Sequence, residues 1–138
     1  MISEFSGEYK FLSNFYDSPI LIDNILFSCV ESAYQAQKTT SRIIRKKFAS
    51  MKAKEAKKFG RQVILRDDWD DIKKDIMEYL VREKFNQNPI LRNKLLGTGN
   101  EELQEGNYWR DTYWGVCNGV GENNLGKILM KIREEIKS

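Results

Sequence analysis

Histidine is absent from this chain of 138 residues, and cysteine and proline occur only twice each. Without histidine, neither a Ser-His or Cys-His nucleophile pair nor an imidazole-ligated metal site can form. The two cysteines, Cys29 and Cys117, lie far apart in the sequence, which argues against a structural zinc site and favours reduced thiols. Acid–base chemistry must therefore rest on Asp, Glu, Lys or Tyr, and we expect neither a metal ion nor a cofactor.

Several common signatures are also missing. The chain has no G-x-G-x-x-G and no G-x-x-x-x-G-K-[ST] motif, so the usual dinucleotide and P-loop sites are not indicated. It has no secretory signal and no apolar run long enough to span a membrane, so we expect a cytoplasmic protein with no membrane contact. The net charge of +3 is too small to claim nucleic-acid binding, and apart from the basic run 42–58 the charges are interleaved. A mild preference for phosphorylated ligands is as far as charge leads.

Length and patterning favour one α+β domain over residues 1–138, mainly helical with a small sheet of short strands. Two short strands are expected on either side of a turn at Asp23-Asn24, and Ser41 is a plausible helix N-cap. Gly60 and Gly97 are plausible helix ends, and Asp67 or Asp68 a plausible helix start. The expected strands are 19–22 and 25–28, and the expected helices are 29–39, 41–50, one ending at 60, 67–87, 88–97 and 124–137.

The segment 27–38 is the most informative part of the chain. Read as a helix, it places the small apolar side chains of Cys29, Val30, Ala33 and Ala36 on one side. The other side presents a carboxylate, a phenol, an amide and an amine within an arc of roughly 100°; these belong to Glu31, Tyr34, Gln35 and Lys38. This polar row is either an ordinary solvated face or the wall of a binding site.

A second informative region runs from 106 to 126. It places two Trp, two Tyr and Asp111 within ten residues and then leads through glycines and Asn123-Asn124 into the last helix. Crowded aromatic rings are either additional core or a surface on which a planar base stacks. The glycines and asparagines at a helix start favour free backbone N–H groups for a phosphate or a sugar oxygen. Trp69 has the same two readings, a hydrophobic staple or part of a binding site.

Taken together, five blocks of the sequence resemble the YbiA-like or NADAR family of N-glycosidases. They occur in the family's order and cover nearly the whole chain: Phe11–Phe15 with Ser18–Ile20, Val30–Lys38, Gly60-Arg61 with Leu65–Trp69, Lys84–Pro89, and Tyr108–Asp111 with Gly119–Met130. Two positions depart from the family pattern. Ser32 replaces a usual histidine, and Arg110 replaces the glycine of a usual Trp-Gly-Asp sequence.

The resemblance implies hydrolysis of the bond between ribose C1′ and a base or arylamine nitrogen. It implies two substrate classes, phosphoribosylamino-pyrimidine intermediates of riboflavin synthesis and ADP-ribose on guanine, either free or in nucleic acid. Glu31, Lys38 and Asp111 are the implied catalytic residues, with carboxylates stabilising an oxocarbenium-like state. A Lys38 amine of lowered pKa can attack C1′, whereas the alternative for Lys38 is a solvated cation at the helix end. The candidate substrate-binding residues are Asn14, Phe15, Tyr34, Gln35, Arg61, Arg66, Trp69, Trp109, Asn123 and Asn124.

A second class of function stays open at this point. The same pocket without turnover would make the chain a non-catalytic ADP-ribose or nucleotide-binding module. Two carboxylates and an amine argue against a pure binder, whereas Ser32 and Arg110 argue mildly for it. In either case the expected partner is a small ribosyl or ADP-ribosyl molecule, and no obligate protein partner is indicated.

Overall fold

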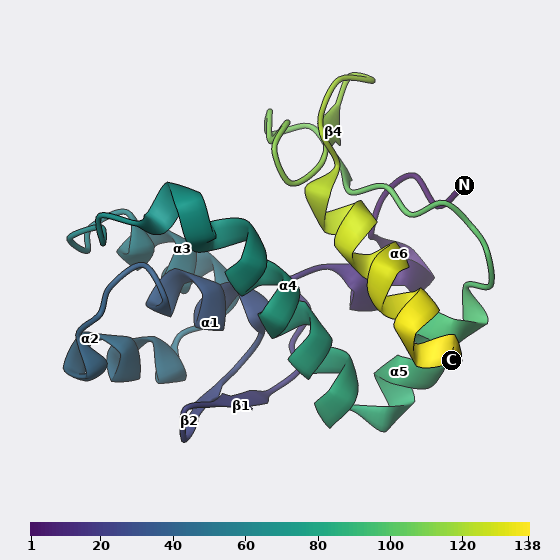
Figure 1. The fold of residues 1–138 in the computed structure, drawn as a ribbon. Helices are drawn as coiled ribbons and strands as arrows, with labels where there is room; N and C mark the ends of the chain where they lie inside the picture. The colour runs from purple at the N-terminus through teal and green to yellow at the C-terminus, as the bar shows by residue number, and fades with distance from the viewer. The chain divides into compact units, whose positions relative to one another are not determined.

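The computed structural model describes all residues from 1 to 138. The chain divides into two compact units, a terminal unit made of Met1–Ser13 with Pro89–Ser138, and a middle unit made of Asn14–Asn88. The organisation as a single domain therefore stays a prediction. The elements run in the order η1 (Gly7–Leu12), β1 (Ile20–Ile22), β2 (Ile25–Phe27), α1 (Val30–Ala36), α2 (Arg42–Lys47), η2 (Phe48–Ser50), α3 (Ala53–Gly60), α4 (Trp69–Gln87), α5 (Pro89–Gly97), β3 (Gly106–Asn107), β4 (Val116–Cys117) and α6 (Asn124–Lys137) (Figure 1). The predicted α+β class, mainly helical with short strands, is confirmed.

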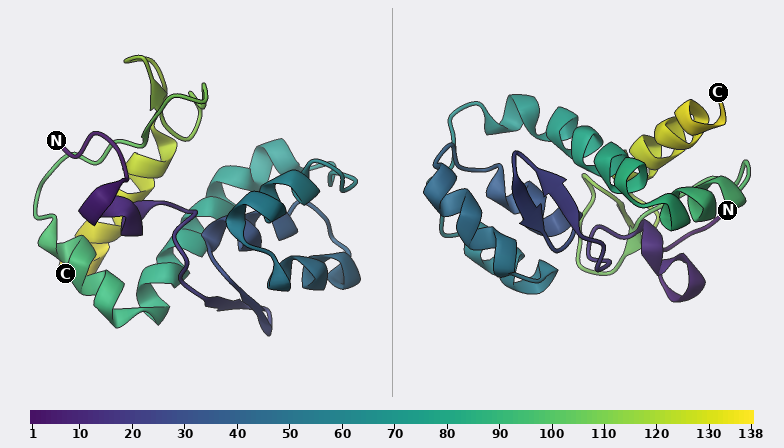
Figure 2. Two further views of the ribbon diagram at one scale, coloured as in Figure 1. Left: turned by 180° about the vertical axis from the view of Figure 1, so that it is seen from behind. Right: turned by 90° about the horizontal axis from the view of Figure 1, so that it is seen from below.

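The strands of the middle unit form the predicted hairpin, seen from another side in Figure 2. β1 and β2 pair antiparallel with Ile22 opposite Ile25, and Asp23 and Asn24 form the turn with φ of 51° and 63°. Both central residues of such a two-residue turn need positive φ, which Asp and Asn tolerate better than other non-glycine residues. The hairpin buries alternate residues, so Ile20, Ile22, Ile25 and Phe27 enter the core of this unit.

Helix α1 lies inside the middle unit and packs against α3 and α4. All seven of its residues, including Glu31, Tyr34 and Gln35, are buried. The solvated-face reading of this helix is therefore wrong. The physical reason is that α3 and α4 cover the side that carries its polar groups, which helical periodicity alone does not reveal.

Most helix boundaries of the middle unit follow the predicted signals. The Ser41 hydroxyl accepts a hydrogen bond from the Ile44 N–H at 3.3 Å and caps α2, and α3 ends at Gly60. The helix expected over 41–50 becomes α2 followed by the 3-10 turn η2. Asp68 precedes α4 but does not cap it with its side chain, because its carboxylate is paired with Arg66 at 2.7 Å.

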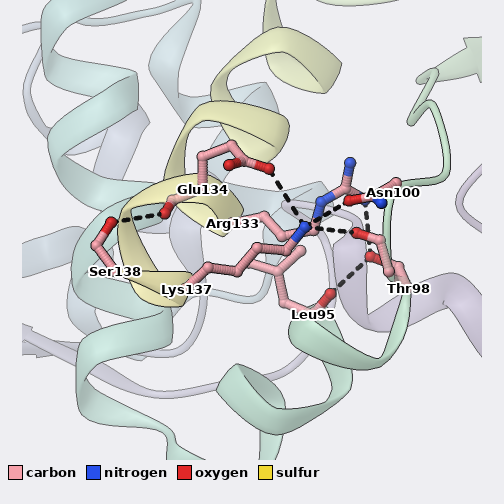
Figure 3. A network of polar contacts seen from close by, with 8 residues as sticks. Leu95, Thr98, Asn100, Arg133, Glu134, Lys137 and Ser138 are labelled. Carbon is pink, nitrogen blue, oxygen red and sulfur yellow. Dashed lines mark hydrogen bonds and ion pairs between the residues drawn. The ribbon is translucent and has the colours of Figure 1, made fainter.

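The terminal unit is built around α5 and α6, which pack against each other. Leu125, Leu129 and Ile132 of α6 are buried and form the side of the helix that faces the core. A polar network joins the last turns of α6 to the end of α5 (Figure 3). Arg133 donates to the Thr98 hydroxyl at 2.9 Å, and the Lys137 ammonium donates to the Asn100 side chain at 2.7 Å. Near the N-terminus, Ile2 forms an isolated parallel β-bridge with Leu103, which connects the start of the chain to the rest of this unit. None of the helices is long and apolar enough to cross a bilayer.

Candidate active site

Glu31 stands in the first turn of α1 and is held from two directions. Its backbone N–H donates to the Asn14 carbonyl at 3.1 Å, and its carboxylate accepts a hydrogen bond from the Gln35 amide nitrogen at 3.2 Å. The side chain of Asn14 in turn contacts the Met77 sulfur on α4 at 3.4 Å. Only 8% of Glu31 is exposed, so its negative charge acts in a weakly screened environment. A fixed carboxylate of this kind can stabilise a positive charge that develops beside it.

Lys38 lies just beyond α1 rather than within it. Helix α1 ends at Ala36, and the Lys38 N–H donates to the Gln35 carbonyl in a closing turn. The side chain is half-buried, and burial lowers the pKa of its amine. The nearby cations Arg61, Lys57 and Lys73 lower this pKa further, whereas the Glu31 carboxylate raises it. The reading of Lys38 as a fully solvated cation does not fit this environment, and the interaction with Glu31 places the two groups in one electrostatic cluster.

Aromatic side chains border this cluster within the middle unit. The rings of Tyr34 and Trp69 pack with their centroids 5.0 Å apart and their planes tilted by 52°, and both are nearly buried. Trp69 therefore anchors the start of α4 on α1. Phe15 is 46% exposed, and the Lys57 ammonium lies 5.7 Å from the centre of its ring. Of these rings, Phe15 offers the accessible surface on which a planar ligand group can stack.

The two candidate arginines differ in their environment. The Arg66 guanidinium forms an ion pair with Asp68 at 2.7 Å and donates to the Gln37 carbonyl, so it connects α4 with the end of α1. Arg61 is exposed, follows α3 directly and forms no ion pair. Arg61 is therefore the better placed of the two to meet a phosphate.

The family position that is usually histidine is buried here. The Ser32 hydroxyl donates to the Phe48 carbonyl at 2.6 Å and fastens α1 to η2. Ser32 thus has a packing role and leaves Glu31 in place beside it. In the terminal unit, Arg110 adopts φ of 67°, a conformation that favours the glycine usual at this position.

In the terminal unit, Asp111 organises the aromatic loop. One of its carboxylate oxygens accepts hydrogen bonds from the N–H groups of Tyr113 and Trp114 at 3.1 and 2.9 Å. The Asn107 amide bridges to the backbone N–H and carbonyl of Asp111. This loop borders a cavity of about 520 Å³, where Trp109 is 49% exposed.

The start of α6 is more occupied than the sequence suggests. The N–H groups of Asn123, Asn124 and Leu125 donate to the carbonyls of 113–115 at 3.0–3.2 Å. The Asn123 side chain accepts from the Glu105 N–H and donates to the Leu103 carbonyl, both at 2.9 Å. The free backbone donors expected here for a phosphate are thus engaged within the loop, because residues 112–115 fold back over the helix start.

The middle unit thus gathers most of the predicted site: Asn14, Phe15, Glu31, Tyr34, Gln35, Lys38, Arg61, Arg66 and Trp69. Trp109, Asp111, Asn123 and Asn124 belong to the terminal unit, and their share in one site with Glu31 stays a prediction. Sequence reasoning missed Lys57 and Lys73 as neighbours of Lys38, since nothing in their spacing marks them. It also took Gly60 only for a helix end, although its place beside Arg61 in a family block was a signal.

Comparison with known proteins finds a matching family and several similar proteins. The model of the NADAR domain matches residues 3–137. A riboflavin biosynthesis protein of Vibrio vulnificus is 40% identical over 133 residues, which are 94% of this chain and 36% of the Vibrio protein. An N-glycosidase of Nostoc punctiforme is 40% identical over 94% of this chain and 87% of its own length. N-glycosidase YbiA of Escherichia coli is 34% identical over 95% and 84%.

A solved structure agrees with this result. The NMR structure of the E. coli protein YbiA matches with a TM-score of 0.86 at 32% identity, covering 99% of this chain and 87% of that chain. The chain therefore spans about a third of the Vibrio protein but most of the Nostoc and E. coli proteins.

Proposed function

Because the chain belongs to the NADAR family, we propose that it is an N-glycosidase that hydrolyses the bond between ribose C1′ and a nitrogen of its substrate. The expectation of an enzyme of this class is confirmed at the level of the family, since relatives that match over most of their length are named N-glycosidases. The reaction and its residues in this chain are the proposal.

One observation carries the proposal: a buried carboxylate and a half-buried amine of lowered pKa share one electrostatic cluster on α1 and its C-terminal turn. Cleavage of a C1′–N bond passes through a state with positive charge on C1′ and the ring oxygen. A carboxylate fixed by a hydrogen bond and by helix packing, as Glu31 is, stabilises this charge without having to reorganise. A module that only binds ADP-ribose needs no such pair, and we therefore place it second.

In the proposed reaction the neutral Lys38 amine attacks C1′, and the C1′–N bond breaks with its electron pair going to the departing nitrogen. That nitrogen takes up a proton, and the Lys38 nitrogen loses one. The ribose ring then opens as its oxygen accepts a proton, which leaves a protonated imine between C1′ and Lys38. Water adds to C1′, expels the amine and releases the free sugar, so water is the only reactant consumed.

For the phosphate end of the substrate we propose Arg61, with Lys57 beside it. Both lie close enough to Lys38 to lower its pKa, and Arg61 has no acidic partner to give up. Arg66 is less suited because binding a phosphate would cost its ion pair with Asp68. Phe15 is the proposed stacking surface in the middle unit.

The substrate we test first is a phosphoribosylamino-pyrimidine, because one relative is named a riboflavin biosynthesis protein. A second candidate is ADP-ribosylated guanine in a nucleic acid, which one feature of the charge distribution favours. Residues 42–61 carry nine basic residues and one acidic residue, a net charge of +8, whereas the whole chain has +3, so the remainder carries −5. A basic surface of this kind attracts a phosphate backbone.

The test is to incubate the purified chain, in the presence of EDTA, with each substrate and to measure the free base and free sugar by chromatography. If the enzyme turns over the phosphoribosylamino-pyrimidine but not the ADP-ribosylated oligonucleotide, its substrate belongs to the first class. Turnover of the oligonucleotide that falls steeply with salt assigns the second. Binding of ADP-ribose without release of base from any substrate would overturn the proposal in favour of the binding module.

A further inference from the structure

The Gln35 side chain is buried between α1 and α3 with its two ends in contrasting surroundings. Its amide nitrogen donates to the Glu31 carboxylate at 3.2 Å, while its carbonyl oxygen has no hydrogen-bond partner. Only 5% of the residue is exposed, so water does not satisfy this oxygen from bulk. Leaving a buried carbonyl unpaired is unfavourable. The reverse orientation is worse, because it would place the carbonyl oxygen against an anionic carboxylate. The charge on Glu31 thus fixes which way the amide points.

The carbonyl end rests on Gly60, the last residue of α3. A Cβ atom built on Gly60 would lie 1.9 Å from the Gln35 carbonyl oxygen and 2.8 Å from its amide carbon. The glycine does not have a positive φ, so its conformation does not require the absence of a side chain. The glycine is needed because the Gln35 amide occupies the space in which a methyl group would stand.

We infer that Gly60 and Gln35 are positioning residues for Glu31: the missing side chain of Gly60 lets the Gln35 amide lie where its nitrogen holds the carboxylate. Gln35 then acts through Glu31 and not through contact with substrate. The inference rests on the proposed function, because it assigns these residues to the reaction in which Glu31 stabilises the charge on C1′. The positioning role also explains why the Gln35 carbonyl oxygen is buried without a hydrogen-bond partner, an arrangement that packing alone would not favour.

Gly60→Ala is the informative variant, because the clash falls on the far end of a flexible side chain rather than on backbone. The fold can therefore yield by turning Gln35 away, which removes the hydrogen bond to Glu31. Gly97→Ala is the matched control, since Gly97 also ends a helix, lacks positive φ and has nothing within 4 Å of its built Cβ. We expect Gly60→Ala to lower kcat by roughly tenfold or more, because small misplacements of catalytic groups are costly. KM should change by less than about twofold, and Gly97→Ala should match the wild type.

The double variant separates positioning from general damage. In a Glu31→Gln background, adding Gly60→Ala should cost almost nothing further, because the charge that Gly60 helps to place is already gone. Gln35→Met, which keeps the volume and removes the donor, should reproduce the fall in kcat even if Gly60→Ala folds poorly. A wild type without turnover would contradict the proposed function itself. An active wild type with normal kcat in Gln35→Met, or an equal loss from Gly60→Ala with and without Glu31, would overturn the positioning role alone.

Discussion

The sharpest single perturbation of the proposed site is Glu31→Gln. The substitution keeps the size of the side chain and removes its charge, and the Gln35 amide nitrogen, now 3.2 Å from a carboxylate oxygen, can donate to the new carbonyl instead. Two unit charges about 4 Å apart at an effective dielectric constant of about 20 interact by about 4 kcal/mol. The charge that develops on C1′ is only part of a unit. A loss of about 2.7 kcal/mol of transition-state stabilisation, or on the order of 10²-fold in kcat, is therefore the expected size.

The same variant makes a second, independent prediction for the pH profile. Burial lowers the pKa of Lys38 and the Glu31 carboxylate opposes this effect, so removing the carboxylate should lower the pKa of Lys38 further. If the neutral amine is the nucleophile, kcat/KM rises with pH up to this pKa. In Glu31→Gln the rising limb should therefore move to lower pH while the plateau falls.

The assay is steady-state release of free base from pH 5 to 10, with kcat and KM fitted separately. Glu55→Gln is the matched control, because Glu55 is an exposed glutamate on α3 of the same unit. A Glu31→Gln enzyme with full kcat would refute the role of Glu31. A plateau that falls without any shift of the rising limb would refute the assignment of that limb to Lys38.

Two further predictions concern the phosphate and a buried amine. Arg61→Ala should raise KM more than it lowers kcat. Arg66→Ala should change KM little and should destabilise the protein, because Arg66 loses its ion pair with Asp68. Equal KM values in Arg61→Ala and the wild type would remove Arg61 from the site. Burial lowers the pKa of Lys84 from 10.5 to about 7, so between these values the unfolded chain binds more protons and the free energy of unfolding should rise with pH, by about 4–5 kcal/mol in total. The free energy of unfolding is measured by urea titration from pH 6 to 10, and Lys84→Met should abolish its rise with pH. Lys74→Met is the control and should keep the rise, because Lys74 is exposed on the same helix. A wild type whose free energy of unfolding does not change over this range would contradict the lowered pKa of Lys84.

Local signals in the sequence predicted most of the fold. The Asp23-Asn24 turn and the Ser41 cap depend on residues whose conformational and hydrogen-bonding preferences act within a few positions, whereas the helices end at Gly60 and Gly97 without the positive φ that would require a glycine. Two features escaped this reasoning because long-range packing decides them. One is the burial of the polar side of α1 beneath α3 and α4, and the other is the folding of 112–115 over the start of α6.

The candidate site shows the same division. Glu31 and Lys38 could be named from one short segment and a family resemblance, but their separation of seven positions does not by itself bring their side chains together. Gly60 could not be assigned in this way. The role proposed for Gly60 depends on the Gln35 amide filling the space that a side chain at position 60 would occupy. Gln35 lies 25 positions earlier in the sequence.

Trapping of the covalent intermediate tests the central claim most directly. Borohydride added to the wild type during turnover should reduce the imine and leave the sugar attached to Lys38, as located by mass spectrometry of the digested protein. Lys38→Arg should remain unlabelled, because its guanidinium stays charged and forms no imine. A wild type that releases free base and sugar under the same conditions yet never carries the label at Lys38 would contradict the account and leave direct attack by water as the mechanism.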